Sequence, residues 1–116
     1  MADYEPDCLF CRIAAGQIPS EIVHADDTVV VFRDISPKAP THLLAIPRRH
    51  IASVDDLADA DGDLLAALFG ALRRVAAEAG VSGYRLVTNV GADAGQSVVH
   101  LHFPLLAGRS MAWPPG

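Results

Sequence analysis

The stretch that decides the fold of this chain reads His100-Leu101-His102-Phe103-Pro104-Leu105-Leu106. Two histidines two positions apart in an aliphatic run point to one face of a β-strand, because successive side chains of a strand alternate between its faces. The run therefore predicts a strand that presents a pair of imidazoles. A histidine on a half-buried strand is more often structural than catalytic, so the spacing by itself leaves both interpretations open.

A glycine-rich stretch precedes the two histidines and reads Gly91-Ala92-Asp93-Ala94-Gly95-Gln96-Ser97. Backbone N–H groups and imidazoles can bind a small anion without any overall positive charge on the protein. A loop of this kind beside paired imidazoles favours phosphate chemistry over core packing.

The chain has 116 residues, of which 51% are hydrophobic, and its formal net charge is −5. We expect one domain over residues 1–116, with residues 1–7 as a flexible arm. Nucleic acid and anionic membrane surfaces both select a broad basic face, so neither is an expected partner. The N-terminus lacks the pattern of a signal peptide, and the longest apolar run, residues 64–72, is too short to span a bilayer. These features predict a cytoplasmic protein.

Hydrophobic periodicity predicts two helices and five strands. Apolar residues recur at helical spacing over residues 61–79, before Gly80, and a shorter helix is predicted over residues 8–15, before Gly16. Strand-like runs lie between turn residues at 21–24, 28–32, 42–46, 84–89 and 97–106. This order predicts an α+β domain with a five-stranded, mainly antiparallel sheet, one long helix and one short helix.

The two cysteines of the chain form a C-x-x-C pair, Cys8 and Cys11. This spacing lets both thiolates bind one metal ion, but a redox dithiol and two small buried hydrophobic residues are also compatible with it. Tetrahedral zinc needs two further ligands. The chain offers five histidines for this purpose, which are His24, His42, His50, His100 and His102.

Four motifs, in order, resemble the histidine triad family, in its Hint branch of nucleotide-binding phosphoramidases. They are Asp34-Ile35-Ser36-Pro37-Lys38-Ala39-Pro40-Thr41-His42, Ile46-Pro47-Arg48-Arg49-His50-Ile51, Gly95-Gln96-Ser97-Val98-Val99-His100-Leu101-His102 and Gly108-Arg109-Ser110-Met111-Ala112-Trp113-Pro114-Pro115-Gly116. The resemblance implies a homodimer that hydrolyses purine nucleoside phosphoramidates, such as adenosine 5′-phosphoramidate and adenylated amines. It also implies that the tail, residues 107–116, brings Trp113 near the active site across the dimer.

The resemblance assigns the reacting group and the phosphate contacts. His102 matches the nucleophile, which forms a nucleotidyl-histidine intermediate that water then hydrolyses. Gln96, Ser97 and the backbone amides around Gly95 match positions that hold the phosphate oxygens. Asn89 also matches a position near the phosphate.

The resemblance further assigns the nucleoside contacts. Asp34 matches the ribose site, where a carboxylate accepts both sugar hydroxyls. Phe10, Ile13 and Ile35 match the apolar slot for the base, although plain core packing explains such residues equally well. His42 matches a histidine that supports the catalytic strand from across the sheet.

Relatives with the same cysteine pair carry zinc on residues that match Cys8, Cys11, His50 and His100. The resemblance therefore implies a structural zinc ion that positions the histidine strand, and it implies no organic cofactor.

One position departs from the family pattern, because Pro104 stands where the third histidine of the triad is expected. Proline has no side-chain donor and no backbone N–H, so it can neither contact the phosphate nor protonate a leaving group. This departure keeps two alternatives open: a weakly active nucleotide-binding or regulatory module, and a nucleotidyl transferase.

Overall fold

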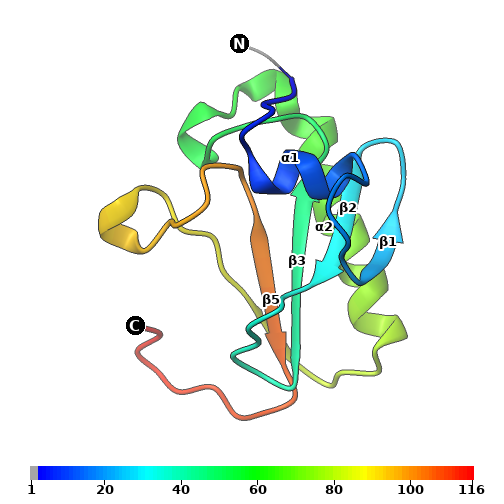
Figure 1. Cartoon of the computed structure of the whole chain (residues 1–116). Coiled ribbons are helices and arrows are strands. Elements are labelled where there is room, and N and C mark those ends of the chain that lie inside the picture. The colour runs from blue at the N-terminus through cyan, green and yellow to red at the C-terminus, as the bar shows by residue number, and fades with distance from the viewer. Residues whose placement is uncertain (1–2) are drawn as a thin grey trace.

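Five antiparallel strands form one sheet in the order β1-β2-β3-β5-β4. The computed structural model describes residues 3–116 (Figure 1). The strands are β1 (Ile22–Ala25), β2 (Val29–Arg33), β3 (Thr41–Pro47), β4 (Tyr84–Leu86) and β5 (Phe103–Ala107). The helices are α1 (Leu9–Ala14) and α2 (Gly62–Glu78), with short 3-10 turns at Val54–Asp56, Asp59–Asp61 and Ala92–Ala94. The predicted α+β class and five-stranded antiparallel sheet are confirmed.

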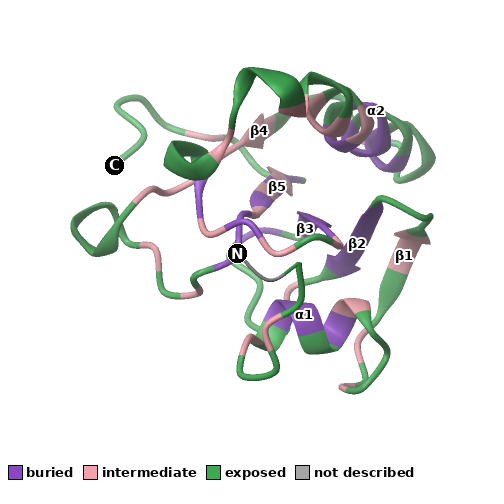
Figure 2. Ribbon diagram, turned by 90° about the horizontal axis from the view of Figure 1, so that it is seen from above, coloured by how far each residue is buried: buried purple, intermediate pink, exposed green. Residues whose placement is uncertain are grey.

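The sheet lies between its two helices, with α2 on one face and α1 on the other (Figure 2). Strand β2 shows why: Val29 and Val31 pack in the cluster under α2, whereas Val30 and Phe32 pack in the cluster under α1. A strand that is covered on both faces reads as a continuous apolar run rather than as an alternating one. The sequence of β2, Val-Val-Val-Phe, follows from this burial.

Helix α2 matches its predicted span of residues 61–79 to within one residue at each end. Its buried face includes Leu68 and Leu72, and Gly80, at φ +69°, follows its C-terminus in the left-handed region that glycine tolerates best. Phe69 is among the apolar residues whose helical spacing predicts the buried face, but it lies at the edge of that face, 42% exposed, with its ring 5.3 Å from that of Phe103.

The strand predicted over residues 97–106 is much shorter in the structure, because β5 begins only at Phe103. Leu101 instead donates its N–H to the Ile51 carbonyl, at 2.6 Å, outside the sheet. Leu101 packs in the cluster under α2, whereas the rings of His100 and His102 both contact Phe10 of α1. The prediction that the two histidines share one face is therefore confirmed, although they precede the strand.

Strand β4 ends at Leu86 rather than at the predicted residue 89, and Pro104 accounts for the difference. Val87 donates its N–H to the Pro104 carbonyl at 3.0 Å, but proline has no N–H to return. The ladder between β4 and β5 stops where this donor is missing. A proline is thus accommodated in a strand that lies between two others.

The N-terminal segment before α1 makes hydrogen bonds to two other parts of the chain. Met1 and Ala2, the first two residues of the predicted arm, lie outside the described residues. The Asp3 carbonyl accepts the His50 N–H at 2.7 Å, and the Tyr4 hydroxyl lies 2.9 Å from Gln17 Oε1. No helix within residues 3–116 is both long and apolar enough to cross a membrane.

Candidate active site and metal centre

A cavity of about 500 Å³ opens beside α1 on the α1 face of the sheet. It gathers residues that are far apart in the sequence: α1, the end of β2, the loop before β3, and the segment that leads into β5. Most of the predicted site residues line it: Phe10, Ile13, Asp34, Ile35, His42, Asn89, Gly95, Ser97 and His102. Gln96 and Trp113 are not among the lining residues.

His102 is held in one orientation at the wall of this cavity. Its Nδ1 lies 2.8 Å from the His100 carbonyl oxygen, so Nδ1 carries the proton and donates. The Phe10 ring packs edge-on against the imidazole, with ring centroids 5.1 Å apart. Nε2 is left with a free lone pair, since no hydrogen-bond partner for it occurs among residues 3–116. A neutral imidazole in this tautomer can act as a nucleophile or a base.

The glycine-rich loop is shaped by Gln96, whose predicted contact with phosphate stays a prediction. The Gln96 side chain accepts the Gly91 N–H at 2.9 Å and donates to the Ala52 and Val98 carbonyls. Its polar atoms therefore close the loop, and Gln96 is not among the residues that line the cavity. Gly95, at φ +94°, turns the chain so that Ser97 reaches the cavity wall.

Asp34 and His42 form a polar corner of the cavity. His42 Nδ1 accepts the Lys38 N–H at 3.0 Å, so the ring proton sits on Nε2, which faces Asp34 Oδ2 at 3.4 Å. Burial lowers the pKa of His42, the Asp34 charge opposes this shift, and the Lys38 charge adds to it. Asp34 Oδ1 is occupied by the Ser36 N–H at 2.8 Å. The imidazole is thus neutral and aims a proton at the second carboxylate oxygen.

The apolar residues assigned to the base differ in their surroundings. Phe10 and Ile13 belong to the buried cluster under α1, so they are both core residues and cavity wall. Ile35 is 95% exposed and lies at the rim, where it is not part of a packed slot. Two cations also line the cavity, Arg33 and Lys38, and neither was predicted as a site residue. Lys38 lies within the motif 34–42, where its positive charge beside Asp34 could have indicated a role.

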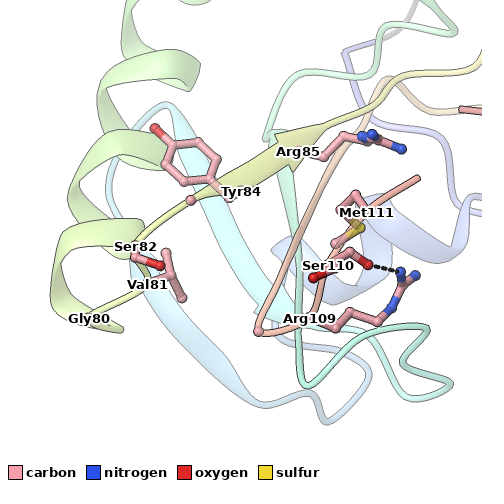
Figure 3. Close-up of a pocket in the computed structure, with 10 residues that line it drawn as sticks. Gly80, Val81, Ser82, Tyr84, Arg85, Arg109, Ser110 and Met111 are labelled. Carbon is pink, nitrogen blue, oxygen red and sulfur yellow. Dashed lines mark hydrogen bonds between the residues drawn. The ribbon is translucent and has the colours of Figure 1, made fainter. Parts of the chain in front are cut away.

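A second cleft, of about 620 Å³, lies between the turn after α2 and the C-terminal tail (Figure 3). Arg85 donates to the Ala112 carbonyl at 3.0 Å, and so ties the tail to β4. Trp113 is 82% exposed and lies outside the cavity of its own chain. Its predicted contact with substrate across a dimer stays a prediction.

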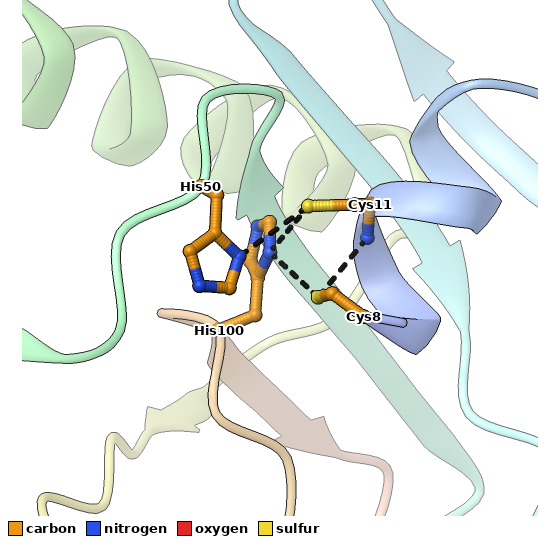
Figure 4. Close-up of side chains that lie close together, drawn as sticks. All are labelled: Cys8, Cys11, His50 and His100. Carbon is orange, nitrogen blue, oxygen red and sulfur yellow. Dashed lines mark hydrogen bonds between the residues drawn. The ribbon is translucent and has the colours of Figure 1, made fainter. Parts of the chain in front are cut away.

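Two cysteines and two histidines meet at the N-terminus of α1 (Figure 4). Cys8 caps the helix, Cys11 lies one turn along it, His50 follows β3, and His100 precedes β5. Their ligand atoms all lie within 4.8 Å of one another. The structure therefore brings together the four residues that the family resemblance implied, from three separate parts of the chain.

The spacing of these atoms fits a tetrahedral ion. His100 Nδ1 lies 3.3 Å from Cys8 Sγ and 3.5 Å from Cys11 Sγ, and His50 Nδ1 lies 3.4 Å from Cys11 Sγ. Tetrahedral zinc with Cys and His ligands places its ligand atoms about 3.4 to 3.8 Å apart. The donor set of two sulfurs and two imidazole nitrogens is one that zinc prefers.

The protonation states of the cluster also suit a metal. His100 donates from Nε2 to the Pro47 carbonyl at 2.9 Å, which leaves Nδ1 as the ligand atom. Burial lowers the pKa of His100 to about 4, so its ring stays neutral. Burial also raises the pKa of Cys11 to about 11, so a cation is needed to stabilise the thiolate. Cysteines that served only as small buried hydrophobic residues would not need two imidazole nitrogens beside their sulfur atoms.

Comparisons with known proteins agree with the fold and the motifs. The family model described as scavenger mRNA decapping enzyme C-term binding matches residues 7–112. An uncharacterised HIT-like protein of Synechococcus elongatus is 44% identical over 111 residues, which cover 95% of this chain and 97% of the relative.

Solved structures show the same likeness. A HIT family hydrolase from Legionella pneumophila has 51% identity and a TM-score of 0.93, and the match covers 95% of this chain and all of the other. A histidine triad protein from Clostridium difficile has 40% identity and a TM-score of 0.90, with 93% and 96% of the two chains covered. The chain therefore belongs to the histidine triad (HIT) family.

Proposed function

We propose that the protein hydrolyses purine nucleoside phosphoramidates, of the adenosine 5′-phosphoramidate type, through a nucleotidyl-histidine intermediate on His102. The observation that carries this proposal is the orientation of His102. Its Nδ1 proton is held by the His100 carbonyl, and its free Nε2 lies at a cavity that also holds a glycine-rich loop. The family relatives that are described as hydrolases support hydrolysis over simple binding.

The proposed reaction has two displacements at one phosphorus atom. The Nε2 lone pair attacks the α-phosphorus and the phosphorus–nitrogen bond to the amine breaks, so the amine leaves with that electron pair and takes up a proton. Water then attacks the same phosphorus and gives up a proton, the bond to Nε2 breaks with its electron pair returning to the ring, and the nucleoside monophosphate is released. Gly95 and Ser97 line the cavity, and we propose that the backbone around Gly95 and the Ser97 hydroxyl stabilise charge on the phosphate oxygens.

The size and the lining of the cavity suit a mononucleotide. Its volume of about 500 Å³ falls within the range of small-ligand sites. Phe10 and Ile13 offer an apolar surface for a base, and the polar corner of Asp34 offers an acceptor for ribose hydroxyls. Arg33 and Lys38 add positive charge to the cavity of an acidic protein.

We further propose that the four-residue cluster holds a structural zinc ion. Such an ion supplies folding stability and immobilises His100. His100 in turn presents the carbonyl that accepts the Nδ1 proton of His102, at 2.8 Å. The metal ligands therefore act on the nucleophile through its orientation.

We also propose a cytoplasmic homodimer. Both cysteines are free, as is usual in a reducing compartment. Strand β4 is an edge of the sheet, and Tyr84 on β4 and Phe69 on α2 are each 42% exposed. An unpaired edge beside exposed aromatic rings suits contact with a second copy.

Incubation with adenosine 5′-phosphoramidate and with adenylated lysine tests the proposed activity. We expect release of AMP from both compounds. Tight binding without release would overturn the proposal in favour of a binding module. Transfer of the nucleotide to an added acceptor, in place of AMP formation, would overturn it in favour of a transferase.

The reaction needs a proton for the leaving amine, and Pro104 cannot supply it. We expect Pro104→His to raise the rate on alkylamine substrates by about 10²-fold or more and to leave activated leaving groups nearly unchanged, because general acid assistance is typically worth about 10²- to 10⁴-fold. Steady-state rates over a series of amines measure the effect.

Pro104→Ala is the matched control for this gain, since it removes the proline ring without adding an imidazole. Circular dichroism and metal analysis establish that each variant is folded and loaded. A folded Pro104→His protein with no gain on any amine would show that His42 or a water molecule already supplies the proton.

A further inference from the structure

The loop between β2 and β3 forms one wall of the cavity but has little packing to hold it. Residues 35–38 are exposed, and Ala39 is the buried residue of the loop. An exposed segment without apolar contacts keeps its conformation only through hydrogen bonds or through contacts with other segments. The shape of the loop matters because it leads into β3, which carries His42, and because the Lys38 N–H that His42 Nδ1 accepts belongs to the loop.

Lys38 is the point at which this loop is held from both sides. Its backbone N–H donates to His42 Nδ1 at 3.0 Å, toward the cavity. Its backbone carbonyl accepts two hydrogen bonds from Arg109, from Nε and from Nη2, each at 3.1 Å. The same residue thus links the imidazole at the cavity with the segment that follows β5.

A second contact holds the same two segments together. Gly108 has φ +93°, and a Cβ atom added there would lie 2.8 Å from Cβ of Pro40. Because a side chain at position 108 would clash with Pro40, only glycine lets the backbone after β5 approach the loop this closely. Arg109 itself is exposed and lines the tail cleft of Figure 3 rather than the cavity beside α1.

We propose that Arg109 is a positioning residue for His42. By holding the Lys38 carbonyl, it keeps the Lys38 N–H on His42 Nδ1 and so keeps the ring proton on Nε2, which faces Asp34 at 3.4 Å. This role of Arg109 rests on the proposed function only for the change in AMP affinity, because the His42 tautomer is measured without turnover.

Arginine is the side chain that this contact requires. Two N–H groups of one planar guanidinium converge on a single carbonyl oxygen. A lysine ammonium is a compact charge on a flexible stem and cannot reproduce that paired geometry. When the two hydrogen bonds from Arg109 are lost, the exposed Lys38 is free to change its backbone conformation. His42 Nδ1 then loses its donor, and both neutral tautomers of the ring become accessible.

Arg85 provides a matched control for this role. It also donates to a backbone carbonyl of the C-terminal segment, that of Ala112, but within residues 3–116 no hydrogen bond joins its side chain to the loop before β3. Because each arginine donates to a carbonyl of this segment, we expect Arg85→Gln and Arg109→Gln both to loosen the tail. Only Arg109→Gln releases Lys38.

The experiment compares the two variants in the metal-loaded full chain by the ring nitrogen chemical shifts of His42 and by AMP affinity. We expect wild type and Arg85→Gln to show the single tautomer protonated at Nε2. We expect Arg109→Gln to show mixed tautomers and an AMP Kd raised roughly 3- to 10-fold, the scale of one lost hydrogen bond. Arg109→Lys should lie between the two, and it serves as the test variant if Arg109→Gln does not fold.

A single unchanged His42 tautomer in folded Arg109→Gln and Arg109→Lys would overturn the proposal. Equal changes in Arg85→Gln and Arg109→Gln would overturn it too, because they would reflect a loosened tail. The tautomer is measured without turnover. A wild-type protein that releases no AMP therefore counts against the proposed function, whereas an unchanged tautomer counts against the role of Arg109.

Discussion

His102→Ala abolishes turnover of adenosine 5′-phosphoramidate while AMP affinity stays within a few-fold of wild type. The imidazole supplies a covalent bond to phosphorus rather than ground-state binding, so its removal acts on kcat. We expect a loss on the order of 10³-fold or more, since no other imidazole at the cavity has a free ring nitrogen of this kind. His42, the other histidine there, has its Nδ1 occupied by the Lys38 N–H.

His24→Ala is the matched control for this variant. His24 lies on β1, pairs with Asp26 at 2.8 Å, and is not among the residues that line the cavity. Its removal should leave kcat unchanged. Single-turnover rates and calorimetric titration with AMP measure both variants. Substantial activity in His102→Ala would remove His102 as the nucleophile.

Loss of the metal is the second change with a large expected effect. Purified protein should contain about one zinc per chain, and Cys8→Ser should lower both the zinc content and the melting temperature, by about 10 °C or more. Without the ion, the half-buried Cys8 and the buried Cys11 and His100 no longer have a common partner. A structural zinc ion contributes its binding free energy to folding.

Elemental analysis and calorimetry measure this effect, and His24→Ala again serves as the control because it removes a histidine outside the cluster. The control should keep its zinc and nearly all of its thermal stability. Protein prepared without chelator that holds almost no metal would contradict the zinc assignment. So would a Cys8→Ser protein that keeps both its zinc and its melting temperature.

Local patterns in the sequence were sufficient to predict the elements of the fold. The apolar spacing of residues 61–79 predicts α2 nearly to its ends, because that helix buries one face against one cluster. Alternation of side chains placed His100 and His102 on one face. The family resemblance identified the four metal ligands that the structure brings together. Their spacing along the chain could not show that they meet.

The structure differs from the predictions where contacts between residues distant in sequence override the local sequence pattern. Leu101 donates to Ile51 outside the sheet and delays β5, and Pro104 ends the ladder to β4. Gln96 resembles a phosphate contact in sequence, but its side chain reaches the Ala52 carbonyl, 44 residues away. The contact of Arg109 with Lys38 spans 71 residues, and nothing in the local sequence indicates it.

The stereochemical course at phosphorus tests the central claim most directly. One resolved diastereomer of an adenosine 5′-phosphorothioate amide is hydrolysed in ¹⁸O-labelled water, and the configuration of the product is determined by phosphorus NMR. Each in-line displacement inverts the configuration, so attack by His102 Nε2 followed by attack of water gives overall retention. Retention is the result that the nucleotidyl-histidine mechanism predicts. Inversion would mean that water attacks the substrate directly, and it would contradict a covalent role for His102.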